Sequence, residues 1–170
     1  LVVKSTLNDY LMWQLGLAPM TDQERRVGEQ IIGNIDPNGY LAASVEEVAG
    51  LESVEPATVE CVLKRIQEFD PPGIAARDLK ECLLIQSRIL QMQGTLVDRI
   101  IDHHIKDLEI KNYANIARKL KVSLQDVLTA VEVIGNMDPK PGSSYNDDRI
   151  QTIIPDVYVV KAGDDYKVTL

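Results

Sequence analysis

Residues 69–79, which read FDPPGIAARDL, decide how this chain folds. Pro71 and Pro72 cannot donate backbone hydrogen bonds, and the residue before a proline is disfavoured in the α region. Gly73 can adopt a positive φ at low cost because it has no side chain. The stretch therefore predicts a sharp break between one helix and the next, with the second helix expected over residues 74–92.

Two related breaks flank this one along the chain. Ile35 is followed by Asp-Pro-Asn-Gly at residues 36–39, and Met137 is followed by Asp-Pro-Lys-Pro-Gly at residues 138–142. In each case an apolar residue closes a helical pattern and an Asp-Pro pair stops it. The same kind of stop is therefore expected three times in a chain built mainly of helices.

The hydrophobic periodicity predicts a mainly α protein with about eight helices. Apolar residues recur at three- and four-residue spacing, and capping boxes begin at Thr21 and Ser44. The helices are expected over residues 6–17, 22–35, 45–51, 56–69, 74–92, 95–108, 112–120 and 123–137. We expect two helical-bundle lobes built from helix pairs, over residues 1–93 and 94–142. Residues 143–170 are expected to form a loop and a β-hairpin or two-strand extension, leading to a missing C-terminal part.

An internal repeat relates two of the expected helix pairs. Asp70-Pro71 corresponds to Asp138-Pro139 at an offset of 68 residues (138 − 70 = 68). The same offset aligns further apolar residues without a gap: Val54 with Val122, Val59 with Val127, Leu63 with Val131 and Ile66 with Ile134. Either a duplication or the convergence of two helical hairpins with similar caps explains this pattern.

The composition restricts the classes of function. A formal net charge of −8 argues against non-specific binding to DNA or to an anionic membrane, because both need a basic face. No apolar run approaches the ~20 residues of a membrane span, and no signal-peptide pattern is present. Cys61 and Cys82 lie on apolar sides of helical patterns, which predicts buried thiols in a reducing compartment. The chain opens mid-pattern without Met, so we expect a fragment of something longer.

Residues 116–123 resemble the first helix and turn of a helix-turn-helix. The helix that would read DNA, expected over residues 124–137, contains no Lys or Arg. It therefore lacks the usual contacts to phosphate and guanine, and a structural role is favoured. The cluster of Arg118, Lys119 and Lys121 remains a candidate contact for phosphate or for an acidic partner.

Catalytic and metal-binding motifs are lacking. His103 and His104 are adjacent, so they point to different faces of a helix, whereas two metal ligands on one face need i,i+3 or i,i+4 spacing. No nucleophile and base can be paired with local support, and no Gly-rich phosphate loop is present. We therefore expect no enzyme, no metal and no cofactor.

Tyr10, Met12 and Trp13 flank the apolar stripe of the first helix. If Met12 and Trp13 lie off that stripe and are exposed, they suit a protein interface. Alternatively, Trp13 packs under the loop at residues 16–20. The sequence leaves both interpretations open.

Five stretches, taken in order, resemble the bacterial sigma-54 factor. They are LMWQL at 11–15, GYL at 39–41, VLKRIQEFDPPGIAARDLKECLLIQ at 62–86, MDPKPG at 137–142 and IIPDV at 153–157. The resemblance covers essentially the whole chain, and the 62–86 block is long and specific. It identifies this segment with the central core-binding region of that family.

The resemblance implies a function without catalysis. In the family this region docks on the β and β′ subunits of core RNA polymerase, so that polymerase is recruited to promoters where it awaits an ATPase activator. Promoter DNA is bound mainly by parts that are missing here, and the activator acts through the missing N-terminal region. The location implied is the bacterial cytoplasm. A DNA-binding helix-turn-helix domain and a generic helical interaction scaffold are the alternatives.

Most of the expected docking residues lie in and just after the central break at residues 69–79. They are Asp70, Pro71, Pro72, Gly73, Arg77, Asp78, Lys80 and Glu81, followed by Tyr10 and Trp13. We expect apolar anchors surrounded by a charged rim, in which the rim affects the association rate more than the affinity. Phe69, Ile74 and Leu79 are expected to hold the fold.

Overall fold

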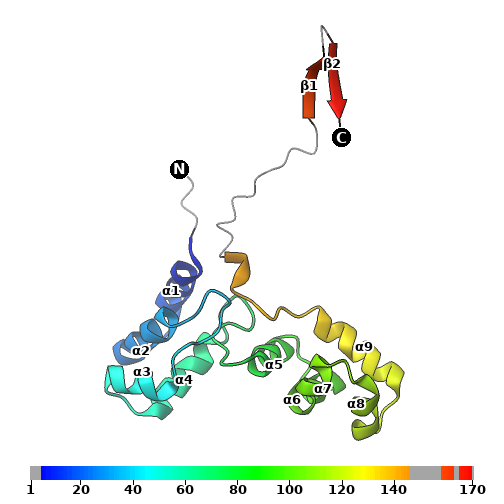
Figure 1. The fold of residues 1–170 in the computed structure, drawn as a ribbon. Helices are drawn as coiled ribbons and strands as arrows, with labels where there is room; N and C mark the ends of the chain where they lie inside the picture. The colour runs from blue at the N-terminus through cyan, green and yellow to red at the C-terminus, as the bar shows by residue number, and fades with distance from the viewer. Residues whose placement is uncertain (1–4, 146–157, 163–164, 170) are drawn as a thin grey trace.

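The computed structural model describes residues 5–145, 158–162 and 165–169 (Figure 1). The protein is mainly α, as predicted. Its helices are α1 (Leu7–Leu17), α2 (Asp22–Gly33), α3 (Val45–Glu52), α4 (Pro56–Ile66), α5 (Leu79–Ile89), α6 (Leu96–His103), α7 (Ile105–Glu109), α8 (Tyr113–Leu120) and α9 (Leu124–Gly135). A short 3-10 turn follows at Ser143–Tyr145.

Two strands are also described near the end of the chain. Strand β1 (Tyr158–Ala162) pairs antiparallel with β2 (Asp165–Thr169), and Tyr158 lies opposite Thr169. The IIPDV stretch at 153–157 and most of the expected loop before it lie outside the described residues. Within the described residues, no helix is both long and apolar enough to span a membrane.

Capping explains where most of the helices begin. The predicted boxes at Thr21 and Ser44 form, and Thr6 forms a third with Asp9. In each box the side-chain oxygen accepts from the backbone of the third helical residue, whose carboxylate accepts in return. Helices α5 and α9 begin after Asp78 and Ser123, whose side chains also accept a backbone hydrogen bond. Most of the helix starts are thus determined by residues close to them in the sequence.

The helix expected over residues 74–92 is shorter, because α5 begins only at Leu79 and ends at Ile89. Ala75 has a left-handed φ of 60°, which a helix does not allow. Its N–H donates to the Gly39 carbonyl at 2.8 Å, and the Ala76 carbonyl accepts from Leu41 at 2.9 Å. The segment before α5 therefore pairs with another part of the chain.

The helix expected over residues 95–108 is interrupted, so that the described residues form nine helices where about eight were predicted. His104 leaves the helical conformation, with φ −129° and ψ 26°, between α6 and α7. Its side chain is largely covered, and Nδ1 lies 3.4 Å from an Asp107 carboxylate oxygen. The hydrophobic spacing continues through this point, which explains why the interruption was missed.

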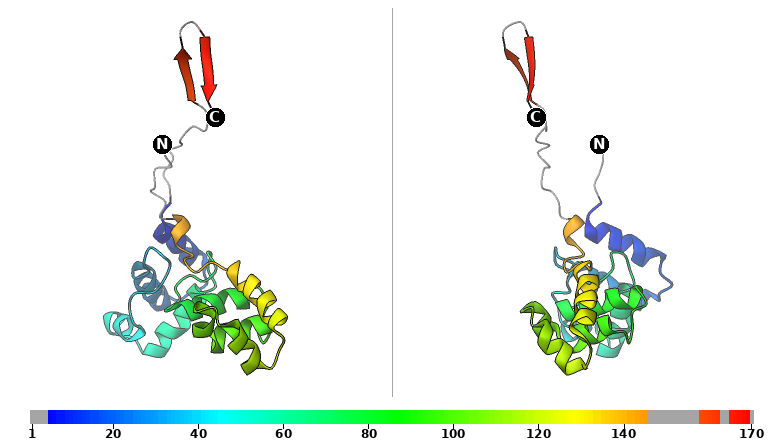
Figure 2. Two further views of the ribbon diagram at one scale, coloured as in Figure 1. Left: turned by 45° about the vertical axis from the view of Figure 1, so that its right-hand side comes forward. Right: turned by 90° about the vertical axis from the view of Figure 1, so that its right-hand side faces the viewer.

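Two hydrophobic clusters organise the helices. The first is formed by α1–α4 with Ile74 and Ala75, and it includes the fully buried Leu11, Leu15, Ile31 and Leu63. The second is formed by Leu83 of α5 together with α6, α8 and α9. Figures 1 and 2 show α1–α4 on one side of the molecule and α5–α9 on the other. Each group of helices thus has a core of its own.

The three predicted breaks meet between these two groups of helices. The Gly142 N–H donates to the Asn38 carbonyl at 2.9 Å, and the Tyr40 hydroxyl donates to the Pro139 carbonyl at 2.6 Å. A Cβ on Gly142 would lie 2.7 Å from the Gly39 nitrogen, so only glycine allows this approach. The contact between Ala75 and Gly39 brings in the third break. We call residues 36–41, 69–78 and 138–142 together the junction.

The repeated helix pairs agree in their boundaries and in their turns. Helices α3 and α8 begin at residues 45 and 113, and α4 and α9 begin at residues 56 and 124, so both offsets are 68. Ser53 and Lys121 occupy the same left-handed position at the turns, with φ of 52° and 55°. The correspondence inferred from the sequence is therefore present in the local structure.

Each group of helices also contains a glutamine clamp, which we define as a carboxamide that bonds both backbone groups of the aspartate in an Asp-Pro break. Gln14 of α1 donates to the Asp70 carbonyl at 2.7 Å and accepts from its N–H at 2.9 Å. Gln86 of α5 makes the same two bonds to Asp138, at 2.7 and 2.8 Å. The first helix of each group thereby holds the break that follows its last helix.

Two expectations about the core were wrong or incomplete. Cys61 is exposed, whereas Cys82 is buried. The buried stripe of α4 consists of Val59, Val62, Leu63 and Ile66, and residue 61 falls off it. Phe69 is only half-buried, although it packs against the first cluster as expected.

Candidate functional site

The structure separates the predicted docking residues into two surfaces and a group that forms a turn. One surface, the aromatic face, comprises Tyr10, Trp13, Tyr145 and Asp70. The other, the charged cleft, is lined by Lys64, Gln67, Arg77, Asp78, Lys80, Glu81, Leu84, Ile85 and Arg88. Pro71, Pro72 and Gly73 belong to the junction.

The aromatic face is a stack of three rings centred on Tyr10. The Tyr10 ring lies 6.1 Å from that of Trp13 and 5.8 Å from that of Tyr145, with small interplanar angles. Trp13 is 60% exposed. Of the two interpretations that the sequence leaves open, exposure is therefore correct and packing under the loop at residues 16–20 is not. Met12 instead packs against the first cluster, so only Trp13 lies free of the core as predicted.

Tyr10 is fixed by a carboxylate from the central break. Its hydroxyl donates to Asp70 at 3.0 Å, and this bond raises the pKa of Tyr10 above its ordinary value. Gln14, one turn further along α1, bonds the backbone of the same aspartate. The side chains of α1 therefore hold Asp70 against Tyr10, the ring on which Trp13 is stacked.

The residues that follow Asp70 serve the turn. The Asp70–Pro71 peptide bond is cis, and Gly73 has a φ of 90°. A Cβ on Gly73 would lie 2.8 Å from both the Cys82 sulfur and the Gln86 amide nitrogen. Gly73 is therefore packed inward against α5 and presents no side chain to a partner.

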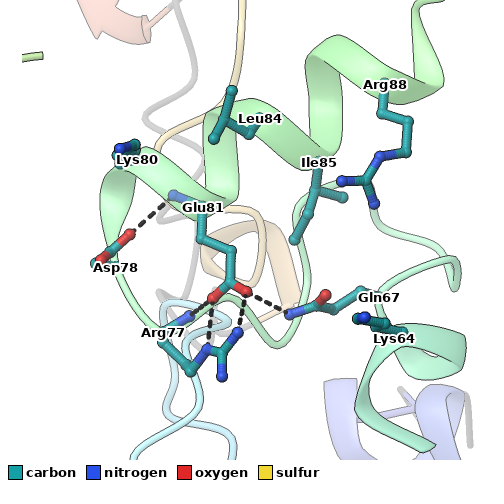
Figure 3. A pocket seen from close by; sticks show the side chains of 9 residues that line it. All are labelled: Lys64, Gln67, Arg77, Asp78, Lys80, Glu81, Leu84, Ile85 and Arg88. Atoms are coloured by element: carbon teal, nitrogen blue, oxygen red, sulfur yellow. Dashed lines mark hydrogen bonds and ion pairs between the residues drawn. The ribbon is translucent and has the colours of Figure 1, made fainter. Parts of the chain in front are cut away.

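The charged cleft lies between the end of α4 and the length of α5 and has a volume of about 480 Å³ (Figure 3). Arg77 forms its central contacts, because its guanidinium donates to Glu81 at 2.8 and 3.1 Å and to Glu60 at 2.7 Å. The Arg77 N–H also donates to Glu81, at 2.7 Å. Gln67, which caps the end of α4, donates to the same carboxylate at 3.3 Å. Glu81 thus joins the two walls.

These contacts shift the ionisation of the pair. Burial alone would raise the pKa of the Glu81 carboxyl, but hydrogen bonds from the Arg77 side chain and backbone and from Gln67 outweigh it and hold the pKa below its ordinary range. The hydrogen bond to Glu81 in turn raises the pKa of Arg77, against the opposing effect of burial. The pair is therefore fully charged at neutral pH.

Sequence reasoning missed three of the polar residues that line the cleft. Lys64, Gln67 and Arg88 are absent from the predicted site, and Tyr145 was missed on the aromatic face. A signal existed for Arg88, because Glu81, Ile85 and Arg88 recur at helical spacing on α5. No comparable signal links Lys64 to them, because only the fold places α4 across the cleft from α5.

The second predicted cluster, Arg118, Lys119 and Lys121, lies on α8 and its turn and does not line the charged cleft. Arg118 donates to Asn115 at 2.7 Å, and Lys121 occupies the left-handed turn position. The following helix, α9, exposes Leu124 and Leu128. In the part of the chain that the structure describes, no group of three His, Cys, Asp or Glu side chains could hold a metal ion.

Comparison with known families decides between the remaining interpretations. The family described as "Sigma-54 factor, core binding domain" matches residues 1–170. The chain belongs to the sigma-54 factor family. A sigma factor is a non-enzymatic transcription initiation factor, so the expectation that the chain is not an enzyme is confirmed.

Individual sigma-54 factors show the same relationship. The chain is 36% identical to the RNA polymerase sigma-54 factor of Pseudomonas putida over 172 residues, and 36% identical to that of Escherichia coli K12 over 171 residues. Both matches cover 97% of this chain, and they cover 35% and 36% of those proteins. The sigma-54 factor of Acidithiobacillus ferridurans is 37% identical over 93% of the chain and is covered over 34% of its length. The chain thus spans about a third of the length of these relatives.

Proposed function

We propose that this chain docks on the β and β′ subunits of core RNA polymerase and so tethers a sigma-54 factor to the enzyme. The observation that carries the proposal is the match of the whole chain to the core-binding domain of that family. The acidic net charge and the two exposed surfaces fit a protein partner better than DNA. Tethering requires binding alone, so no residue is assigned a catalytic role.

The aromatic face is proposed as the anchor of this interface. Trp13 is exposed and is stacked on Tyr10, which is itself bonded to Asp70. A large aromatic side chain that is already held in place loses little conformational entropy on binding, which suits it to a hot spot. Trp13 is therefore proposed to insert into an apolar depression of the partner.

The charged cleft is proposed as part of the rim. Arg77 and Glu81 are occupied by each other, so they stabilise the cleft as much as they present charge. Asp78 is exposed, and Lys80, whose side chain is 41% exposed, pairs with Asp102 at 3.0 Å. Exposed rim charges affect mainly the association rate and its salt dependence. The predicted cluster at Arg118, Lys119 and Lys121 remains a secondary candidate.

The wider role follows from the family. We propose that promoter DNA and an ATPase activator are engaged by parts of the sigma factor outside this chain, and that the protein works in the bacterial cytoplasm, where polymerase is found. We also propose that the two clusters of helices act as two lobes. The predicted boundary at residue 93 stays a prediction, and the packing of α5 with α6 favours a boundary near Asp78.

Site-specific crosslinking tests the proposed surfaces. A photoreactive residue at Trp13 or at Lys80 is expected to crosslink to the β or β′ subunit when the sigma factor is mixed with core polymerase. Ile110, which is 72% exposed and lies on neither surface, is the control position. Gel filtration of the same mixture measures binding. If the factor co-elutes with core polymerase and only Ile110 crosslinks, the surfaces are wrong; if it does not co-elute at all, the function is wrong.

A further inference from the structure

We propose that the charged cleft binds an acidic peptide segment of the polymerase core. In this arrangement Lys64 and Arg88 pair with carboxylates of the segment, and an apolar side chain of the segment lies against the apolar lining at Leu84 and Ile85. The inference rests on the proposed function, because it names the chemistry of the partner that the cleft recognises.

The first argument is the charge of the cleft, which opposes that of the protein. The chain has a net charge of −8, yet the side chains lining the cleft include Lys64, Arg77, Lys80 and Arg88 against only Asp78 and Glu81. A concave surface of one sign concentrates ligands of the opposite sign. The cleft is therefore a local site for an anion on an acidic molecule.

The second argument is which of these cations are already paired. Arg77 is paired with Glu60 and Glu81, and Lys80 is paired with Asp102. Among the residues that the structure describes, neither Lys64 nor Arg88 has an ion-pair partner, and both are exposed. These two side chains are thus the ones that can accept a partner's carboxylates without breaking an existing pair.

The third argument is the arrangement of the cleft. Figure 3 shows Arg88 reaching from α5 past Ile85, and Lys64 on α4 on the opposite side of Gln67. Gln67 is buried, and its amide donates to the Ala75 carbonyl at 3.2 Å as well as to Glu81. The floor is therefore fixed before a partner arrives, while the two cations remain free to reorient. Such preorganisation reduces the entropy lost on binding.

An acidic peptide fits these features better than nucleic acid does. A phosphate backbone carries charge at every nucleotide and would pass the carboxylates of Asp78 and Glu81 at one end of the cleft. A phosphate backbone also has no apolar side chains that could pack against Leu84 and Ile85. A peptide can alternate carboxylates with apolar side chains and so match both kinds of lining.

Charge reversal in the intact sigma factor tests the inference. The double variant Lys64→Glu, Arg88→Glu is expected to bind core polymerase about tenfold or more weakly, with a reduced dependence on salt, because two attractions become repulsions. The control is Lys106→Glu, Lys111→Glu, which makes the same change of charge at exposed cations of α7 and the turn after it. The control is expected to stay within about twofold of the unchanged protein.

A neutral pair of substitutions guards against misfolding. Lys64→Gln, Arg88→Gln should melt at the same temperature as the unchanged protein and should still weaken binding, by less than the reversal does. An oligoglutamate peptide should compete with core polymerase for the unchanged protein and not for the Glu variant.

The outcomes separate the inference from the proposed function. If the unchanged protein fails to bind core polymerase, the proposed function is wrong and the inference with it. If the unchanged protein binds but both cleft variants bind equally well, or the control loses as much affinity, only the inference is overturned. It is also overturned if the cleft variants lose binding to duplex DNA while keeping their affinity for polymerase.

Discussion

The two glutamine clamps make the same hydrogen bonds in different surroundings. Gln86 is 6% exposed and lies against Cys82 and the inward-packed Gly73, beneath the junction. Gln14 is half-buried. Both aspartates are exposed, but the hydrogen bonds of Gln86 to Asp138 are partly buried, whereas those of Gln14 to Asp70 are exposed. Water can replace a lost partner at the surface but not in the interior. The same pair of hydrogen bonds therefore contributes more to stability at Gln86 than at Gln14. We infer that the Gln86 clamp fixes the last break against α5 at the junction, whereas the Gln14 clamp mainly orients the aromatic face.

Removing the buried clamp is expected to have the largest effect. Gln86→Ala leaves the Asp138 N–H without its partner and the Asp138 carbonyl with only the Cys82 thiol at 3.6 Å, and it opens a cavity against Cys82, so the free energy of unfolding should fall by about 2–4 kcal/mol. Urea titration followed by circular dichroism measures it. Gln93→Ala, at an exposed glutamine of the turn after α5, is the matched control and should change stability by less than about 0.5 kcal/mol. Equal losses in the two variants would contradict a special role for Gln86.

The surface clamp should cost less. Gln14→Ala is expected to lower the free energy of unfolding by about 0.5–1.5 kcal/mol, because water can reach the Asp70 backbone. If it costs as much as Gln86→Ala in the same titration, the comparison between the clamps fails. A second measurement tests the comparison between the clamps further. Binding to core polymerase should weaken in Gln14→Ala by more than its loss of stability explains, since Tyr10 and Asp70 lose their support.

These clamps also mark the limit of what the sequence could predict. The three breaks and the capping boxes were predicted because proline, glycine and N-cap residues act locally. The meeting of the breaks was not, because the bond between Asn38 and Gly142 joins segments that share no local pattern. The early start expected for α5 failed for the same reason. Ala75, Leu79 and Cys82 are spaced as on one face of a helix, but the contact of Ala75 with Gly39 sets a left-handed φ.

The residues of the candidate site also divide into those predicted from their neighbours in sequence and those brought together only by packing. Arg77, Asp78, Lys80 and Glu81 were predicted together because they are neighbours in sequence, and they line one cleft. The contribution of α4 was missed because only the packed structure brings Lys64 opposite Arg88. Phe69 illustrates a gap of another kind. The pattern identified it as apolar but could not show that it is half-buried, so truncation should cost less than the ~3–5 kcal/mol of a fully buried Phe.

Acid should distinguish the clamps from the ion pair in the charged cleft. The pKa of Glu81 is lower in the folded protein than in the unfolded chain, so its contribution is present above the unfolded pKa and is lost as the pH falls through the folded one. Glu81→Gln should therefore cost about 1 kcal/mol at neutral pH, a value reduced by the partial exposure of Arg77. The difference should disappear in acid. The clamps carry no charge at the glutamine, so the cost of Gln86→Ala should change much less over the same range.

The smallest expected change in stability is at the residue next to the surface clamp. Trp13→Ala removes a ring that is 60% exposed and contacts mainly Tyr10, so the free energy of unfolding should change by about 0.5 kcal/mol or less. Binding to core polymerase should nevertheless weaken about tenfold or more, as expected for an aromatic anchor. Leu17→Ala, at another exposed apolar residue of α1, controls for the loss of surface area. If Trp13→Ala destabilises the protein while its affinity for polymerase is unchanged, the ring supports α1 and the break that Gln14 holds, and the docking role assigned to the aromatic face is wrong.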